Sequence, residues 1–322
     1  ILFPIFDHVR ADIVPQRRGD DYEIASEDID DWLYGTCTRC LELVVDLAVQ
    51  FHQAVVDAGV IPDLLKLLCG LASRAHEQLA ACGVVAFKRL LINGAPLMKE
   101  REWHQCMEAL QKAFDETTPN FGVFSDETTD VDATRAAIIS VKTQTLLVSA
   151  ANDLSTEATS SRASFNVDTL FVLLDVLEGV YTKAAVASRQ LTSLNDEPDA
   201  ETRASVDDTA PLILGLEAHA SALMLRTLSQ LQGDGVVART EQLVRVAALA
   251  LENYLQFDAA NPYIDVRQSV RVHAQVSVDA LDAVRTLDPA RFKSNLPKLY
   301  PLLTSLIRRD DKPNELSQAL GD

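Results

Sequence analysis

The sequence predicts an all-α fold in which many helices stack into one elongated array. Apolar residues recur at alternating steps of three and four along most of the chain, which is the spacing of one helix face. The 322 residues include only 12 glycines and 12 prolines, few for a sheet-rich fold with many tight turns. Leucine, alanine and valine dominate, and an apolar content of 48 % supports a substantial core.

The first predicted helix follows a polar, acidic stretch over residues 11–31, which we interpret as an insertion loop. Asp30 or Asp31 can cap its first turn. The expected buried stripe consists of Leu33, Cys37, Cys40, Leu41, Val44, Leu47, Ala48, Phe51 and Val55.

Further helices are predicted at short intervals in the first third of the chain. Pro62 suits a first helical position before "DLLKLLCGLAS". The helix in "HEQLAACGVVAFKRLLING" should end at Gly94, because glycine commonly terminates helices. The helix in "EREWHQCMEALQKAFDET" should bury one face: Trp103, Met107, Leu110 and Phe114.

The rest of the chain alternates helices with polar breaks. Linkers are expected over 115–132 and 193–208, with a shorter break over 156–164. Asn166 is a good N-cap for the helix that follows it. The last helices are expected near 210–231, 236–257, 262–286 and 289–309. Pro297 and Pro301 should kink or split the final one, because proline removes a backbone donor.

About ten helices of this kind, paired every ~40 residues, predict an array similar to HEAT or armadillo repeats. A compact helical bundle is the alternative. We divide the chain into a first helical-repeat segment (1–121), middle helices with acidic linkers (122–209) and C-terminal repeats (210–322).

Charge and cysteine content narrow the functional classes. The formal net charge is −18, and such a field repels phosphate backbones, so no nucleic-acid partner is expected. The five cysteines are an odd number, which favours a reducing cytosolic setting over a disulfide scaffold. No run long and apolar enough for a membrane span is present. The chain begins without methionine, which we interpret as the interior of a larger protein.

Cys37 and Cys40 form a C-x-x-C pair, a spacing known from zinc and redox sites. Both fall on the apolar stripe of a helix, where cysteine behaves as a small hydrophobe. Zinc needs two further ligands, and no second pair is present among the nearest candidates, His52, Cys69 and His76. We therefore predict buried structural cysteines that bind no metal.

Catalytic motifs are absent from the sequence. It contains no glycine-rich phosphate loop, no G-x-S-x-G and no H-E-x-x-H. The pairs Asp20–Asp21 and Asp30–Asp31 could attract magnesium in principle, but a solvated acidic loop explains them as well. No cofactor is predicted, and a magnesium-dependent helical enzyme stays a weaker alternative.

The C-terminal end is locally basic. Seven cations occur between Arg285 and Lys312, against three acids, Asp288, Asp310 and Asp311. On an ideal helix Arg291, Lys298 and Arg309 would share one face. A solvated helix face is the ordinary explanation. The functional alternative is a surface for a protein partner or an acidic lipid, made by Arg291, Lys293, Lys298, Arg308 and Arg309.

Several segments resemble the region downstream of the catalytic Sec-seven domain in large Arf guanine-nucleotide exchange factors of the brefeldin-A-inhibited (BIG) type. The similar segments are "ILFPIFDHVR", "WLYGTC", "LELVVDLAVQF", "LLKLLCGL", "LAACGVVAFKRLL", "ALQKAFDETTPNF" and, near the end, "FKSNLPKLYPLLTSLIR". The first 121 residues carry most of the resemblance, and residues 122–260 carry little.

The resemblance implies a non-catalytic, helical regulatory region of an exchange factor that acts in Golgi vesicle and protein transport. It implies small GTPases of the Arf or Rab type as partners, self-association, and a location in the cytosol and at trans-Golgi or endosomal membranes. Nothing in the sequence resembles the Sec-seven domain, so no catalytic residue is carried over. A generic HEAT-type adaptor, such as a nuclear-transport receptor, is the alternative.

Overall fold

The computed structural model describes residues 32–124, 131–160, 167–192, 200–233, 238–256, 266–309 and 313–321. Within these ranges the chain forms twelve α-helices, a π-helical turn (η1, Trp32–Cys37) and a 3₁₀ turn (η2, Phe121–Phe124), with no strand. None of the helices it describes is long and apolar enough to cross a bilayer. The predicted all-α helical-repeat fold is confirmed.

The first α-helices of the described chain lie between residues 38 and 116. Their bounds are α3 Thr38–Gln50, α4 His52–Asp57, α5 Ile61–Ala72, α6 Glu77–Gly94 and α7 Glu100–Glu116. Those of the remaining helices are α8 Val131–Ser160, α9 Val167–Thr192, α10 Ala200–Gly233, α11 Thr240–Gln256, α12 Val266–Arg285, α13 Pro289–Arg308 and α14 Asn314–Gly321.

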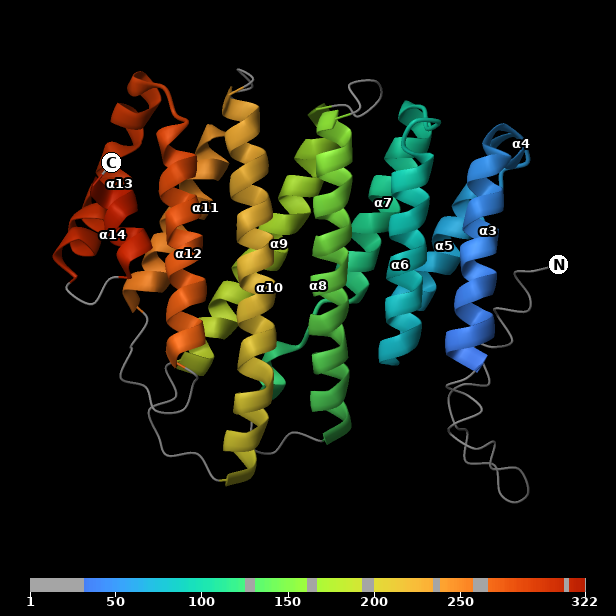
Figure 1. Cartoon of the computed structure of the whole chain (residues 1–322), viewed down its shortest axis with the longest axis horizontal. Helices are drawn as coiled ribbons and strands as arrows, with labels where there is room; N and C mark the ends of the chain where they lie inside the picture. The colour runs from blue at the N-terminus through green and yellow to red at the C-terminus, as the bar shows by residue number, and fades with distance from the viewer. Residues whose placement is uncertain are drawn as a thin grey trace.

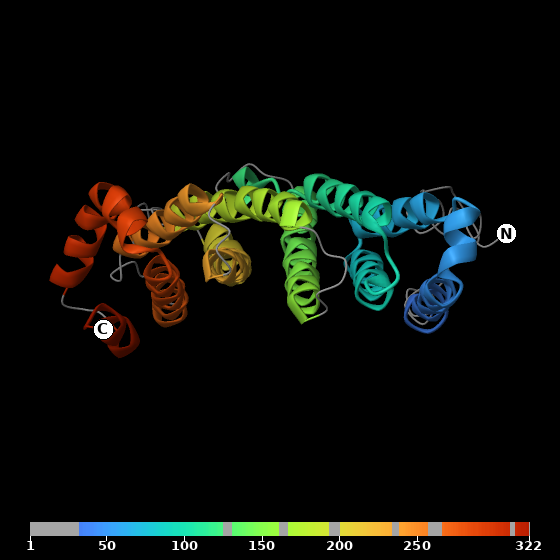
Figure 2. The same cartoon turned by 90° about the horizontal axis from the view of Figure 1, so that it is seen from above.

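The helices alternate between two layers. In the first layer α3, α6, α8, α10, α12 and α14 stand side by side, each packed against the next (Figure 1). The second layer contains α5, α7, α9, α11 and α13 in the same order (Figure 2). The array bends gently, with the first layer on its inner side. Each helix therefore contacts only near neighbours in sequence, as in repeat proteins.

The core lies between the layers and runs the length of the array. Helices of both layers contribute buried apolar side chains to it, and the predicted face of α7 is confirmed: Trp103, Met107, Leu110 and Phe114 are all buried. Helices α5 and α6 approach each other closely at Gly83. A Cβ atom there would lie 2.6 Å from the backbone nitrogen of Ala72, so glycine lets these two helices touch.

The predicted first helix is corrected in two respects. It is interrupted at Phe51, where the backbone leaves helical geometry (φ −109°, ψ 34°) between α3 and α4. Its buried face includes Val45, whereas Leu47 and Phe51 are about half exposed. This helix carries apolar residues on more than one side, so their spacing alone could not show which side faces the core.

The second acidic linker is shorter than predicted, because α10 already begins at Ala200 and continues through Pro211. The final helix is not split, and α13 contains both Pro297 and Pro301. A further helix, α14, was not predicted. The insertion over 11–31, the proposed caps Asp30 and Asp31, and Asn166 lie outside the described residues.

Candidate functional site

The structure distributes the five predicted basic residues between different roles. Arg291 lies in the first turn of α13 and forms an ion pair with Asp288 at 2.8 Å. Asp288 also caps this helix, since its carboxylate accepts from the backbone nitrogens of Ala290 and Arg291 at 3.0 Å. The Arg291 side chain is therefore paired with the residue that caps its own helix.

Arg309 turns inward instead of joining a common face with Arg291 and Lys298. It follows the end of α13 in an extended conformation (φ −73°, ψ 124°). Its guanidinium donates to the carbonyl oxygen of Tyr254 at 2.7 Å and stacks over the Tyr254 ring at 4.8 Å. The single-face alignment is therefore wrong for Arg309, which fastens α13 to the end of α11.

Lys293, Lys298 and Arg308 are exposed on α13. Two large apolar side chains accompany them: Tyr300 is 62 % and Ile307 is 61 % exposed. Tyr300 and Ile307 were not among the predicted site residues. The signal was present, since Lys293, Tyr300 and Ile307 are seven residues apart and so lie nearly on one line along the helix.

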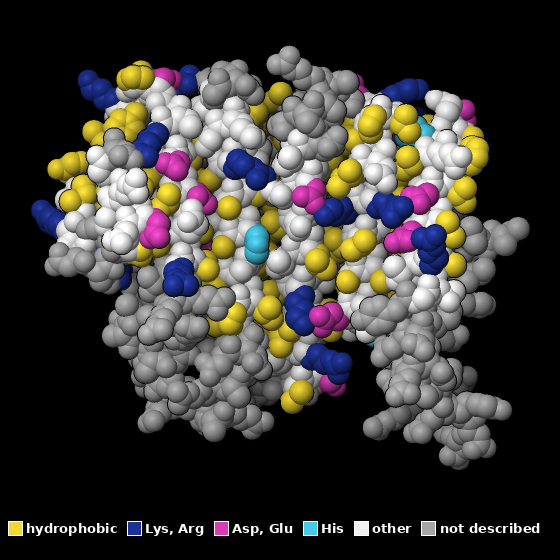
Figure 3. All heavy atoms as spheres, viewed as in Figure 1, with side chains coloured by type: hydrophobic (Ala, Val, Ile, Leu, Met, Phe, Trp, Pro, Cys, Tyr) yellow, Lys and Arg dark blue, Asp and Glu magenta, His cyan; other side chains and the backbone are white. Residues whose placement is uncertain are grey.

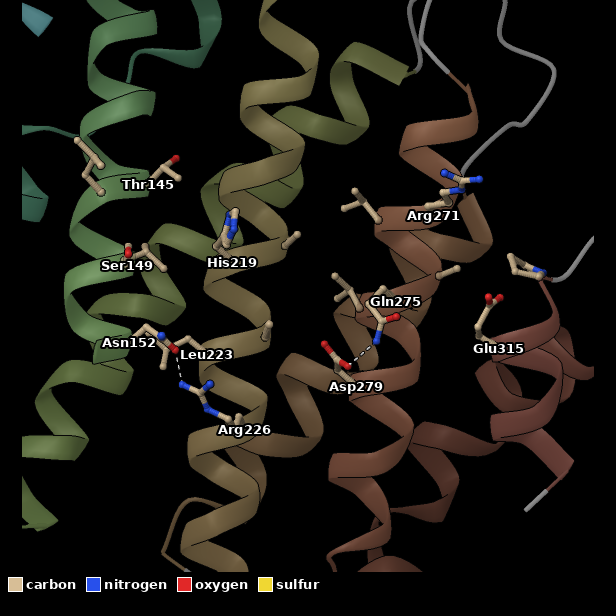
Figure 4. Close-up of a pocket in the computed structure, with 18 of the residues that line it drawn as sticks. Thr145, Ser149, Asn152, His219, Leu223, Arg226, Arg271, Gln275, Asp279 and Glu315 are labelled. Atoms are coloured by element: carbon tan, nitrogen blue, oxygen red, sulfur yellow. Dashed lines mark hydrogen bonds between the residues drawn. The ribbon is translucent and has the colours of Figure 1, made fainter. Parts of the chain in front are cut away.

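A second candidate surface is a groove of about 1310 Å³ across α8, α10, α12 and the start of α14 (Figure 4). Its apolar lining includes Leu146, Val148, Ala218, Ala222, Leu223, Val272 and Val276. Figure 3 views the molecule from the side of the first layer, where hydrophobic side chains are interspersed with basic and acidic groups.

Small residues on the outer ridge of α10 leave room for this groove. Gly215, Ala218 and Ala222 follow at steps of three and four, and a Cβ atom at Gly215 would meet nothing within 4 Å. Sequence reasoning missed the groove, although this run of small residues was visible. Small side chains on an outward face lower the ridge between two helices.

The groove also has polar lining residues. Arg226 of α10 donates to the Asn152 side chain of α8, and Gln275 donates to Asp279 at 3.0 Å along α12. Partial burial raises the pKa of Asp279; the Asp282 charge adds to this and the Gln275 hydrogen bond opposes it. A lining that combines apolar and charged side chains is usual for a protein-binding surface.

The cysteines have the surroundings of structural residues. Cys37, Cys69 and Cys106 are buried, and all five are free thiols. Burial raises the pKa of Cys37 to about 11 and that of Cys69 to about 12, so both stay protonated near neutrality. A thiolate is needed for nucleophilic or metal chemistry. Cys40 is only partly buried, and its predicted freedom from metal stays a prediction for elemental analysis.

The described ranges contain no group of three or more His, Cys, Asp or Glu side chains that could hold a metal ion. Asp20–Asp21 and Asp30–Asp31 lie outside them. His76 has a structural role, because its Nδ1 accepts from the backbone nitrogen of Leu79 at the start of α6.

A buried polar cluster joins three helices behind the groove. Asn253 of α11 donates to Glu217 of α10 at 2.7 Å. His273 of α12 has its Nδ1 3.7 Å from the same carboxylate oxygen. Burial lowers the pKa of His273, while the Glu217 charge opposes that shift. No local pattern in the sequence indicates this cluster, because its members are distant along the chain.

The family model of the BIG2 C-terminal domain matches residues 142–322, more than half of the chain. The chain belongs to this family. Two relatives from Arabidopsis thaliana align with its whole length: brefeldin A-inhibited guanine nucleotide-exchange protein 2, at 27 % identity, and brefeldin A-inhibited guanine nucleotide-exchange protein 3, at 26 %. The family resemblance is thereby confirmed.

The chain spans about a fifth of the length of these curated relatives, 21 % of the first and 20 % of the second. No solved structure matches it. The family match covers residues 142–260, where the sequence segments showed little resemblance.

Proposed function

We propose that this chain is a non-catalytic regulatory region of an Arf guanine-nucleotide exchange factor. It binds small GTPases of the Arf or Rab type, associates with further copies of the exchange factor, and helps to recruit it from the cytosol to trans-Golgi or endosomal membranes in vesicle transport. Family membership and the names of the two aligned relatives support an exchange factor as the whole protein.

The observation that carries a partner-binding role is the groove of the first layer. Apolar side chains of α8, α10 and α12 line it, together with the charged side chains of Arg226, Arg271, Asp279 and Glu315. A folded partner such as a small GTPase would bury apolar area in this groove, and that burial would provide the affinity. We assign the GTPase contact to this groove.

The groove assignment is tested by filling it. Leu146 lines the groove and is 38 % exposed, and the Leu146→Arg change places a long cation over the apolar lining. Val186, 40 % exposed on α9 of the second layer, gives the matched control Val186→Arg. Biolayer interferometry with GTP-loaded Arf should show about tenfold weaker binding for the groove variant alone. Equal affinity of the two variants would contradict the assignment.

The non-catalytic role has a separate test. The chain should leave the nucleotide-exchange rate of Arf at its intrinsic value, measured with a fluorescent GDP analogue at micromolar chain concentration. The physical reason is that exchange requires a group that displaces the phosphates or magnesium, and nothing in this chain resembles the Sec-seven domain that supplies one. A rate clearly above the intrinsic one would contradict this part of the proposal.

A further inference from the structure

Helix α13 differs in charge from the rest of the molecule. It carries four cations, Arg291, Lys293, Lys298 and Arg308, and no aspartate or glutamate between Pro289 and Arg308. The whole chain has a formal net charge of −18. Charges beyond a Debye length of roughly 8 Å are largely screened at physiological salt, so this helix has a locally positive surface.

The exposed side of α13 is also apolar in part. Tyr300 and Ile307 are more than half exposed. Lys293 lies on the same line along the helix, one heptad before Tyr300 and two heptads before Ile307. Helix α13 packs against α11, and Leu299 and Leu306 on its other side are fully buried. The helix is therefore fixed on one side and exposed on the other, where Lys293, Tyr300 and Ile307 lie along one edge and Lys298, two residues before Tyr300, lies near the other edge.

The position of α13 leaves this side accessible. It is the last helix of the second layer, at the opposite end of the array from α3 (Figure 2). Arg309 fastens its C-terminal end to α11, through the carbonyl oxygens of Tyr254 and Leu255. The exposed side is thus held in a defined orientation on the folded array.

We propose that the exposed side of α13 docks on an anionic lipid bilayer. Lys293, Lys298 and Arg308 contact acidic headgroups, while Tyr300 and Ile307 insert at the level of the glycerol backbone. This inference rests on the proposed function, and it names the lipid surface and the residues that would recruit the exchange factor.

Two features favour a bilayer over an acidic protein surface. Two of the three exposed cations are lysines, which are depleted in the centres of protein interfaces but common in segments attracted to acidic membranes. Tyr300 and Ile307 also lie along one line of the helix and are more than half exposed, which suits shallow insertion into a soft interface. Asp310 and Asp311 follow in the sequence, outside the described residues, and are kept unchanged in the test.

The test is flotation of the whole chain with vesicles of phosphatidylcholine alone or with added phosphatidylserine. Wild-type chain should bind the phosphatidylserine vesicles and not the neutral ones. The Lys293→Glu/Lys298→Glu variant should bind at least about tenfold more weakly at physiological salt, because each cation contributes on the order of a fewfold in affinity. Circular dichroism and urea unfolding check that the variant is folded.

A matched variant reverses two exposed cations at the far end of the second layer. Lys66 of α5 and Arg101 of α7 are exposed, and Lys66→Glu/Arg101→Glu changes the net charge by the same amount. It should keep binding close to that of the wild type. A loss equal to that of the α13 variant would mean that net charge alone governs the attraction, and would overturn the proposal.

The insertion of Tyr300 and Ile307 into the bilayer is tested separately. Tyr300→Trp should be quenched by brominated phosphatidylcholine mixed with phosphatidylserine, by more than the wild-type tryptophans are, and Ile307→Ser should weaken vesicle binding severalfold even at raised salt. Unchanged flotation of the Ile307→Ser and charge variants, or wild-type chain that ignores acidic vesicles, would overturn the proposal. GTPase binding, measured separately with Leu146→Arg, distinguishes this failure from failure of the groove assignment.

Discussion

At the scale of single residues, the structure separates cations that hold the fold from cations that face solvent. Arg309 and Arg308 are neighbours in sequence, yet only Arg309 reaches the carbonyl oxygens at the end of α11. Those acceptors lie more than fifty residues earlier in the chain. Local spacing could place both arginines at the end of the last helix but could not tell them apart.

Replacement of Arg309 by alanine should lower the free energy of unfolding by about 2 kcal/mol, because it removes charge-assisted hydrogen bonds and a cation–π contact. Arg308→Ala is the adjacent control, and it should stay within about 0.5 kcal/mol of the wild type, as exposed substitutions usually do. Urea unfolding followed by circular dichroism measures both. Similar losses for the two variants would show that Arg309 does not fasten α13.

His273 predicts a dependence of stability on pH. Burial lowers its pKa in the folded chain below the ordinary value of roughly 6.5. At pH values between the pKa of His273 in the folded chain and its pKa in the unfolded chain, the unfolded chain binds more protons. The stability of the folded chain should therefore fall as the pH drops below about 6.5. Urea unfolding from pH 7.5 to 5 should show a smaller fall for His273→Gln than for the wild type.

The control for this comparison is His219→Gln, which removes an exposed histidine from α10. This variant should lose stability at low pH as the wild type does. An identical pH profile for His273→Gln and the wild type would mean that other groups, mainly the many carboxylates, account for the effect.

At the scale of helices, the sequence was informative about periodicity and less informative about orientation and ends. The buried face of α7 was predictable because its outer side is polar throughout. That of α3 was not, because Leu43 and Leu47 are as apolar as Val45 and yet are 48 % exposed. Pro297 is exposed, and a proline at such a site costs less because the carbonyl left unpaired can bond to water.

Helix ends and the groove depend on contacts between distant segments. The start of α10 at Ala200 lies in a stretch of acidic and small residues that resembles a linker. The groove requires α8, α10, α12 and the start of α14 to be adjacent, which no local pattern specifies. The five basic residues were proposed from composition, and their binding role stays a prediction.

The close contact between α5 and α6 predicts that one added methyl group at Gly83 destabilises the fold. Gly83→Ala places its Cβ 2.6 Å from the Ala72 nitrogen and 2.8 Å from the Leu71 Cβ, so the two helices must separate. The free energy of unfolding should fall by about 2 kcal/mol, as for other overpacked sites. Gly70→Ala in α5 meets nothing within 4 Å and should be neutral or stabilise by up to about 1 kcal/mol.

Gly70→Ala is the matched control, because both changes add one methyl group within a helix and remove the same backbone entropy from the unfolded chain. Thermal or urea unfolding compares them directly. A stable Gly83→Ala variant would show that α5 and α6 can move apart at little cost, and that their close approach is not required.

At the scale of the whole molecule, stability is distributed along a row of helices and not concentrated in one centre. Each first-layer helix packs on the next, and each second-layer helix does the same. Such arrays behave approximately as a chain of neighbouring units, each coupled mainly to the next. A destabilising substitution at one end of the array should therefore affect only the helices near it. One in the middle should destabilise the helices on both sides.

Two equivalent substitutions test this coupling. Leu41 in α3 and Leu216 in α10 are both buried, with 1 % and 0 % exposure, and replacement of either by alanine should cost about 2–5 kcal/mol. Native-state hydrogen exchange should show faster exchange in α3, α5 and α6 for Leu41→Ala, with α9 to α12 unchanged. Leu216→Ala should accelerate exchange from α8 through α12, since α10 contacts α8, α9, α11 and α12. Uniform acceleration throughout the described helices by Leu41→Ala would instead show that the array unfolds as a single cooperative unit, and a defect at α3 would then weaken the groove and α13 as well.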